Sequence, residues 1–101
     1  MGKLVRDRIP EIMRREGKAP DVGRVSGDRR RGALKDKLVE EAAELRGSAD
    51  AAGDVMAELV DVLEVVDAIV DAYGLDRAEI EALKHKKREE RGGFDEGYFL
   101  K

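Results

Sequence analysis

The sequence predicts an all-α protein, with residues 1–101 folded as a single domain that resembles an antiparallel four-helix bundle. Apolar residues recur at spacings of three and four along most of the chain, and no run alternates convincingly with the period of two that marks a β-strand. Glycines separate the periodic stretches. A chain of 101 residues suffices for one core and is short enough to favour pairing with a second copy.

The first helix is expected at residues 7–16. Apolar residues recur there at roughly helical spacing, Pro10 is best accommodated in a first turn, and Gly17 ends the stretch. Residues 17–29 contain three glycines, one proline and no sustained periodicity. They therefore form the one long connection in the chain, which is either mobile or a lid, and whether a lid would extend over residues 17–33 is left open.

Three longer helices are expected after this connection. Residues 29–48 carry an apolar face that includes Leu34, Leu38 and Leu45. Residues 50–73 carry a second, wider stripe, for which Ser48 or Asp50 is a plausible N-cap. Residues 76–91 begin with Asp76 and Glu79, a spacing typical of a capping box, and end before two glycines.

Composition excludes several classes of protein. The 20 basic and 23 acidic residues nearly balance, so the total charge favours neither nucleic-acid binding nor an acidic tail. The absence of cysteine excludes a disulfide-rich secreted miniprotein and a thiolate metal site. Acidic residues interrupt the most apolar stretch, 55–73, which argues against a membrane span. We therefore expect a cytoplasmic protein with no membrane or nucleic-acid partner.

Two pairs of carboxylates lie at the borders of the apolar faces. Glu41 and Glu44 border the face of the 29–48 helix, and Glu58 and Asp61 border the face of the 50–73 helix. If these helices form an antiparallel hairpin, the two pairs converge on one oxygen-rich site of the kind that Mg²⁺ prefers. The alternative is that each pair belongs to an ordinary solvated helix face.

Basic residues accompany these carboxylates. Lys37 lies on the same helix edge as Glu41, one turn earlier, while Lys87 and Arg91 continue the inward stripe of the 76–91 helix. Such cations could bind phosphate oxygens. The alternative for Lys87 and Arg91 is that cations near a helix C-terminus simply interact with the helix dipole.

Four motifs resemble one known family. "EEAAE" at 40–44 and "ELVD" at 58–61 resemble the EExxE and ExxD signature of the MazG-type all-α nucleoside triphosphate pyrophosphohydrolases. The opening "KLVRDRIPEIM" and the closing "KKREERGGF" resemble the small single-domain branch of that superfamily, described as house-cleaning or phosphoribosyl-ATP pyrophosphohydrolase-like. The resemblance covers essentially the whole chain.

This resemblance implies a Mg²⁺-dependent hydrolase, with Mn²⁺ as a possible substitute, that cleaves a nucleoside triphosphate between the α and β phosphates. Glu41, Glu44, Glu58 and Asp61 would be metal ligands. The catalytic carboxylates would be Glu40 and Glu41, and Glu40 would support the metal ligands or position water. Phosphate would be bound by Lys37, Lys87 and Arg91. The products would be a nucleoside monophosphate and pyrophosphate, and the family assembles as homodimers or homotetramers.

Two alternatives remain open at this point. One is phosphoribosyl-ATP hydrolysis in histidine biosynthesis, which uses a similar fold and breaks the same bond. The other is a non-catalytic helical module that binds a nucleotide or a partner protein. The sequence does not indicate which base or sugar the substrate would carry. It also does not indicate the number of metal ions or whether the protein is a dimer or a tetramer.

Overall fold

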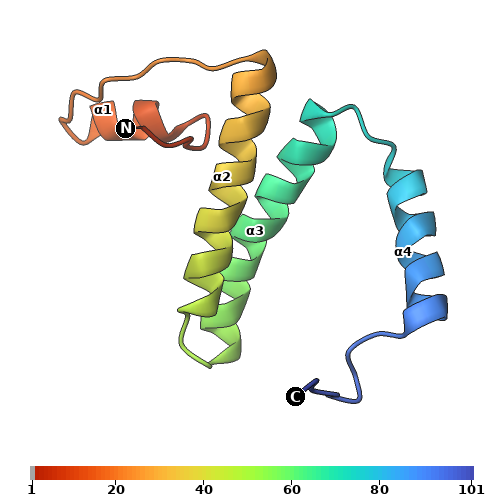
Figure 1. The fold of residues 1–101 in the computed structure, drawn as a ribbon. Coiled ribbons are helices and arrows are strands. Elements are labelled where there is room, and N and C mark those ends of the chain that lie inside the picture. Colours follow the sequence, from red (N-terminus) through yellow and green to blue (C-terminus); the bar gives the residue numbers. More distant parts are fainter. Residues whose placement is uncertain (1) are drawn as a thin grey trace.

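A computed structural model describes residues 2–101 and contains four helices and no strands in that range. The helices are α1 (Ile9–Arg15), α2 (Gly27–Arg46), α3 (Ala52–Ala72) and α4 (Arg77–Arg91), shown in Figure 1. The predicted all-α fold is therefore confirmed. The predicted helix ends differ from the observed ones by no more than two residues.

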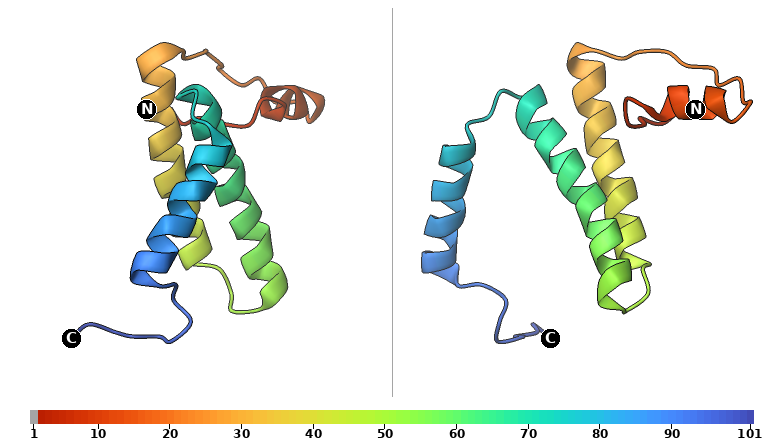
Figure 2. Two further views of the ribbon diagram at one scale, coloured as in Figure 1. Left: turned by 90° about the vertical axis from the view of Figure 1, so that its right-hand side faces the viewer. Right: turned by 180° about the vertical axis from the view of Figure 1, so that it is seen from behind.

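The two long helices, α2 and α3, form an antiparallel hairpin (Figures 1 and 2). Its core contains Leu34 from α2 and Val65 and Val70 from α3, each less than 9% exposed. The ring of Tyr73, at the end of α3, lies 5.5 Å from the Arg31 guanidinium and 5.3 Å from the Lys35 ammonium, near the start of α2. This contact joins the end of α3 to the start of α2.

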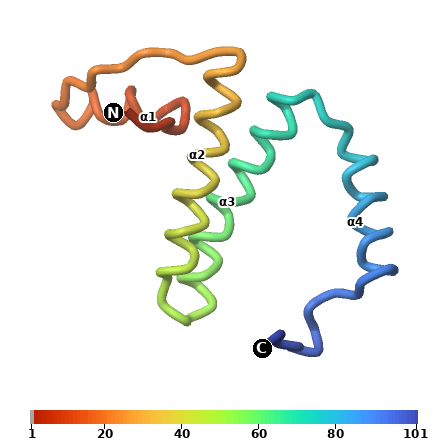
Figure 3. The backbone as a smooth tube through the Cα atoms, viewed as in Figure 1, coloured from red at the N-terminus to blue at the C-terminus, as the bar shows by residue number. Residues whose placement is uncertain are grey.

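The N-terminal part of the chain lies beside the first half of α2. Helix α1 ends at Arg15, and two residues later Gly17 has a φ of 82°, a conformation that glycine adopts without strain. Residues 18–26 then run back to the start of α2, as the tube in Figure 3 shows. The expected long connection is thus present, and it returns the chain to the hairpin.

The start of α3 differs from the prediction. The N-cap is Ala51, which provides no side-chain hydrogen bond, rather than Ser48 or Asp50. The Ser48 hydroxyl instead donates to the carbonyl of Leu45 at 2.7 Å and so contributes to the end of α2. By contrast, Asp76 caps α4 as predicted, because its carboxylate accepts from the amides of Ala78 and Glu79.

Helix α4 does not complete a four-helix bundle within this chain. It stands apart from the hairpin in Figures 1 and 2, and no residue on it is buried. A salt bridge of 3.0 Å from Arg77 to Asp67 joins its first turn to α3. The polar sequence of α4 explains this position, because Ile80 and Leu83 alone offer little apolar surface, and Leu83 is 55% exposed. The expected closed bundle is not confirmed.

The chain exposes more surface than a compact protein of its size. Its accessible surface is 8993 Å², whereas a folded monomer of 11.2 kDa exposes about 5,700 Å². The Cα radius of gyration is 17.2 Å, against about 13 Å for a compact domain of this length. The exposed residues include an apolar stripe along α3 formed by Met56, Leu59, Val60, Leu63 and Val66.

None of the described helices combines the length and the apolar character needed to cross a lipid bilayer.

Candidate metal centre

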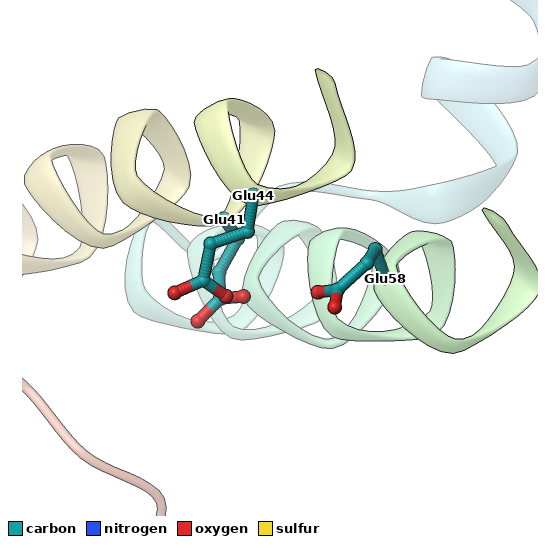
Figure 4. Close-up of side chains that lie close together, drawn as sticks. All are labelled: Glu41, Glu44 and Glu58. Atoms are coloured by element: carbon teal, nitrogen blue, oxygen red, sulfur yellow. The ribbon is translucent and has the colours of Figure 1, made fainter. Parts of the chain in front are cut away.

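Three glutamates from the two helices of the hairpin meet at one point, which we call the carboxylate cluster. Glu41 and Glu44 come from α2, and Glu58 comes from α3. Carboxylate oxygens from all three lie within 4.8 Å of one another, and Figure 4 shows the three side chains side by side. The hairpin therefore brings three of the four predicted metal ligands together from both helices.

Glu41 is the buried member of the cluster, with an exposed fraction of 7%. Its Oε1 lies 3.3 Å from the ammonium group of Lys37, one turn earlier on α2. Its Oε2 is buried and has no hydrogen-bond partner. A buried polar atom without a partner costs roughly 1–3 kcal/mol, and more when it is charged. A cation at the cluster would remove this cost by accepting Oε2 as a ligand.

The three glutamates of the carboxylate cluster repel one another. The negative charge of Glu41, with smaller effects from Glu58 and Glu40, raises the pKa of Glu44 above its usual value. Glu44 is the exposed member of the cluster. Lys37 is the one cation within salt-bridge distance of Glu41 among residues 2–101, so the three carboxylates exceed the positive charge beside them.

The donor set fits a hard divalent cation. All three side chains supply oxygen, which Mg²⁺ and Mn²⁺ accept, and no sulfur or imidazole is present to favour a softer metal. Octahedral Mg²⁺ places opposite ligands about 4.2 Å apart, so small rotations of flexible glutamate side chains would bring these oxygens into range. The residues present therefore fit a magnesium ion.

Asp61, the fourth predicted ligand, lies outside the carboxylate cluster. It follows Glu58 by one turn on α3, and its Oδ1 accepts a hydrogen bond of 2.7 Å from Arg6. This ion pair engages one oxygen of the carboxylate that the sequence assigned to the metal. Asp61 has a second oxygen, Oδ2, that does not take part in this hydrogen bond.

Glu40 lies beside the cluster and is held by two lysines. Its Oε2 is 3.1 Å from Lys37 and its Oε1 is 3.2 Å from Lys3. The hydrogen bond from Lys37, followed by that from Lys3, lowers the pKa of Glu40. Burial by itself would lower the pKa of Lys37, but its bonds to Glu40 and Glu41 outweigh burial and raise it. Glu40 is thus a weak proton acceptor and is well placed to position both lysines.

Sequence reasoning missed Lys3 and Arg6. Both belong to the N-terminal segment, and they reach Glu40 and Asp61 across 37 and 55 residues of sequence. Helical periodicity carries no information about such distant contacts. The sequence feature that could have indicated these two residues is the pair of cations in "KLVR", and this feature alone is weak evidence for a functional site.

Lys87 and Arg91 are not brought to the carboxylate cluster within one chain. Both are exposed on α4, which makes no extensive contact with α2 or α3. Arg91 instead borders a hollow of about 480 Å³ formed with residues 92–98. Their predicted role in phosphate binding stays a prediction.

No family model matches the chain, and no solved structure matches it. An uncharacterized protein of Mycolicibacterium smegmatis is 50% identical to it over 48 residues. The match covers 48% of this chain and 49% of that protein, so the chain spans about half the length of the relative it matches.

Proposed function

We propose that this chain is a member of the MazG-type superfamily and a Mg²⁺-dependent nucleoside triphosphate pyrophosphohydrolase. It would convert a canonical or modified nucleoside triphosphate to the monophosphate and pyrophosphate. One observation carries the proposal, namely that Oε2 of Glu41 is buried without a partner beside Glu44 and Glu58. The resemblance of residues 40–44 and 58–61 to the family's acidic motifs supports it independently.

The roles of the residues follow from their positions. The cation would be held by Glu41, Glu44 and Glu58, and a movement of the Asp61 side chain toward the cluster would add a fourth ligand. When bound, Mg²⁺ would act as a Lewis acid on the phosphate oxygens and increase the acidity of water at the site. Lys37 contributes positive charge at the edge of the cluster, where it compensates charge on the phosphates. No nucleophilic side chain is required.

We also propose that the working form is a homodimer or a larger homo-oligomer. The surface in excess of a compact monomer is about 3,300 Å² per chain, which is more than each partner needs to bury in an extensive obligate interface, about 1,000–2,500 Å². Residues of the α3 stripe, including Leu63 at 52% exposure, are apolar and repeat at helical spacing. A second copy could cover this stripe with its own, as symmetric dimers do.

A substrate panel tests the proposed reaction. Pyrophosphate release is measured from canonical and damaged ribo- and deoxyribonucleoside triphosphates and from phosphoribosyl-ATP, each with Mg²⁺ and with a chelator. Glu58→Gln removes a proposed ligand while keeping the side chain's size. Glu64→Gln is the matched control, because Glu64 is an exposed glutamate of the same helix outside the carboxylate cluster.

We expect Mg²⁺-dependent release that is lost in Glu58→Gln and retained in Glu64→Gln. The substrate turned over fastest will decide between general nucleotide hydrolysis and the histidine-biosynthetic reaction. No release from any compound, by a protein that is folded and oligomeric, would favour a non-catalytic binding module.

A further inference from the structure

A large cleft opens beside the carboxylate cluster. It has a volume of about 1,410 Å³ and lies between the N-terminal segment with α1, the connection at residues 20–26, and one face of α2. We call it the N-terminal cleft. Its volume exceeds the usual range for small-molecule sites, about 300–1,000 Å³, so a nucleotide would fit within it.

One wall of the cleft is a strip of α2 that leads to the proposed metal centre. The strip contains Arg29, Ala33, Lys37 and Glu40, at spacings that place them on one side of the helix. Arg29 and Glu40 are 11 residues apart, or about 16 Å along the helix axis. Lys37 belongs to both sites, because it lines the cleft and also contacts Glu41 of the cluster.

The charges along the cleft favour an anionic ligand, because six cations line it against four carboxylates, those of Asp7, Asp21, Asp36 and Glu40. Lys3, Arg6 and Lys37 line the end near the cluster. Arg24, Arg29 and Arg30 also line the cleft, and none of these three has a carboxylate within salt-bridge distance among residues 2–101. Unpaired guanidinium groups around a concave surface attract phosphate and other anions.

The cleft also has an apolar lining. Leu4, Pro10, Met13 and Val25 all line it, and each is partly buried. Apolar side chains combined with a few charged groups are typical of sites for organic ligands, whereas a site for inorganic phosphate alone has no need of them. The cleft therefore suits a ligand that has both a polyanionic and an apolar part.

We propose that the N-terminal cleft binds the nucleoside part of a nucleoside triphosphate, with the phosphates directed toward Lys3, Arg6 and Lys37. This proposal rests on the proposed function for the position of the phosphates relative to the metal. It adds the location of the nucleoside and assigns Lys3 and Arg6, which the family motifs did not include, to phosphate binding. Bound phosphates would compete with Glu40 and Asp61 for these two cations.

Release of Arg6 from Asp61 would have a second effect. The Asp61 carboxylate would then lose its charge partner, which favours its movement toward a cation held by Glu58, one turn away on α3. Nucleotide binding and completion of the metal ligands are thereby linked through Arg6. A Lys3→Ala/Arg6→Ala variant should bind nucleotide more weakly, while the exposed ion pairs that it removes contribute little to folding.

Methionine methyl NMR tests the location of the nucleoside. Met13 lines the cleft, whereas Met56 lies on α3 outside it and is 62% exposed, so one labelled sample contains both a probe and a control. The ligand is α,β-methylene-ATP, which resists cleavage between the α and β phosphates, compared with inorganic triphosphate. The Met13 signal is assigned with Met13→Leu. We expect the nucleotide analogue to shift the Met13 signal, inorganic triphosphate to shift it less, and neither to shift Met56.

A pair of variants tests the same point by affinity. Ala33→Leu adds bulk to the middle of the cleft wall, whereas Ala43→Leu adds the same bulk at an exposed α2 position outside the cleft. We expect the first to weaken binding of the analogue about tenfold, equivalent to about 1.4 kcal/mol, and the second to leave it unchanged.

These measurements separate the two proposals. Pyrophosphate release without any response of Met13 to the analogue would overturn the cleft assignment and leave the proposed function standing. A specific Met13 response together with no hydrolysis of any nucleotide would support the cleft and overturn the proposed reaction. Equal shifts at Met13 and Met56, or equal losses in the two alanine variants, would overturn the cleft assignment.

Discussion

The ammonium group of Lys37 lies 3.3 Å from Oε1 of Glu41, and the two side chains are only 15% and 9% exposed. This ion pair satisfies one oxygen of Glu41 and leaves Oε2 without a partner. Lys37 also contacts Glu40, so a single lysine joins the carboxylate cluster to the N-terminal cleft. The stability and the proposed chemistry of the site both depend on this pair.

Removing Lys37 should destabilise the metal-free protein. In Lys37→Met the buried Glu41 carboxylate loses its charge partner, a change that costs about 3 kcal/mol in comparable buried pairs. Chemical denaturation in the presence of a chelator measures the loss. In a double-mutant cycle, adding Glu41→Gln should restore much of the stability. If the two losses simply add, the pair is not coupled and this account of Glu41 is wrong.

Magnesium should stabilise the folded protein. A ligand that binds only the folded state at 100 times its dissociation constant adds about 2.7 kcal/mol to the free energy of unfolding. Thermal unfolding with increasing Mg²⁺ should therefore show a rising midpoint for the wild type. Glu58→Gln should show a much smaller rise and Glu64→Gln a normal one. An equal rise in all three would show that the ion acts elsewhere.

Two neighbouring glutamates should affect stability with opposite signs. The lowered pKa of Glu40 means that its ionised form stabilises the fold above its unfolded pKa of about 4.3, an effect that is lost as pH falls through the folded pKa. The raised pKa of Glu44 means that its ionised form destabilises the fold above the folded pKa, and this penalty disappears as pH falls through that value.

The corresponding variants separate these effects. With a chelator present near pH 7, Glu40→Gln should lower the midpoint of thermal unfolding and Glu44→Gln should raise it. Both differences from wild type should shrink toward about pH 3, where the wild-type carboxyls become protonated. Shifts of the same sign near neutral pH would contradict the electrostatic description of the cluster.

A charge in the α3 stripe should disrupt the proposed oligomer. Leu63 is 52% exposed in the centre of the stripe, and Leu63→Asp would place a carboxylate in the expected interface. Sedimentation should give at least twice 11.2 kDa for the wild type and a single-chain mass for the variant. Glu64→Ala, next to the stripe, is the control and should remain assembled. A wild-type protein that sediments as a monomer would contradict the proposed homo-oligomer.

The sequence was most informative where the determinants are local. Apolar spacing located all four helices, and the Asp76 cap was recognised because its partners are two and three residues away. The border positions of Glu41, Glu44 and Glu58 were read from the same periodicity, and the hairpin brings them together. At the start of α3, where Ser48 turns back to α2, the same reasoning chose the wrong cap.

Long-range relationships could not be read from the sequence. The closed bundle was expected because each helix has an apolar face. The periodicity of α4 predicts that such a face exists, but it does not predict which other helix the face packs against. The pairing of Arg6 with Asp61 is likewise set by the path of the chain through residues 17–26, and it separates Asp61 from the other three carboxylates. Both outcomes depend on tertiary structure that local patterns do not encode.

The most direct test of the central claim is phosphorus NMR of the products formed from the preferred nucleoside triphosphate and Mg²⁺. Cleavage between the α and β phosphates predicts nucleoside monophosphate and pyrophosphate in equal amounts, with no reaction in chelator and none in Glu41→Gln. Formation of nucleoside diphosphate and inorganic phosphate, or equal turnover by Glu41→Gln, would contradict the proposed reaction at the carboxylate cluster.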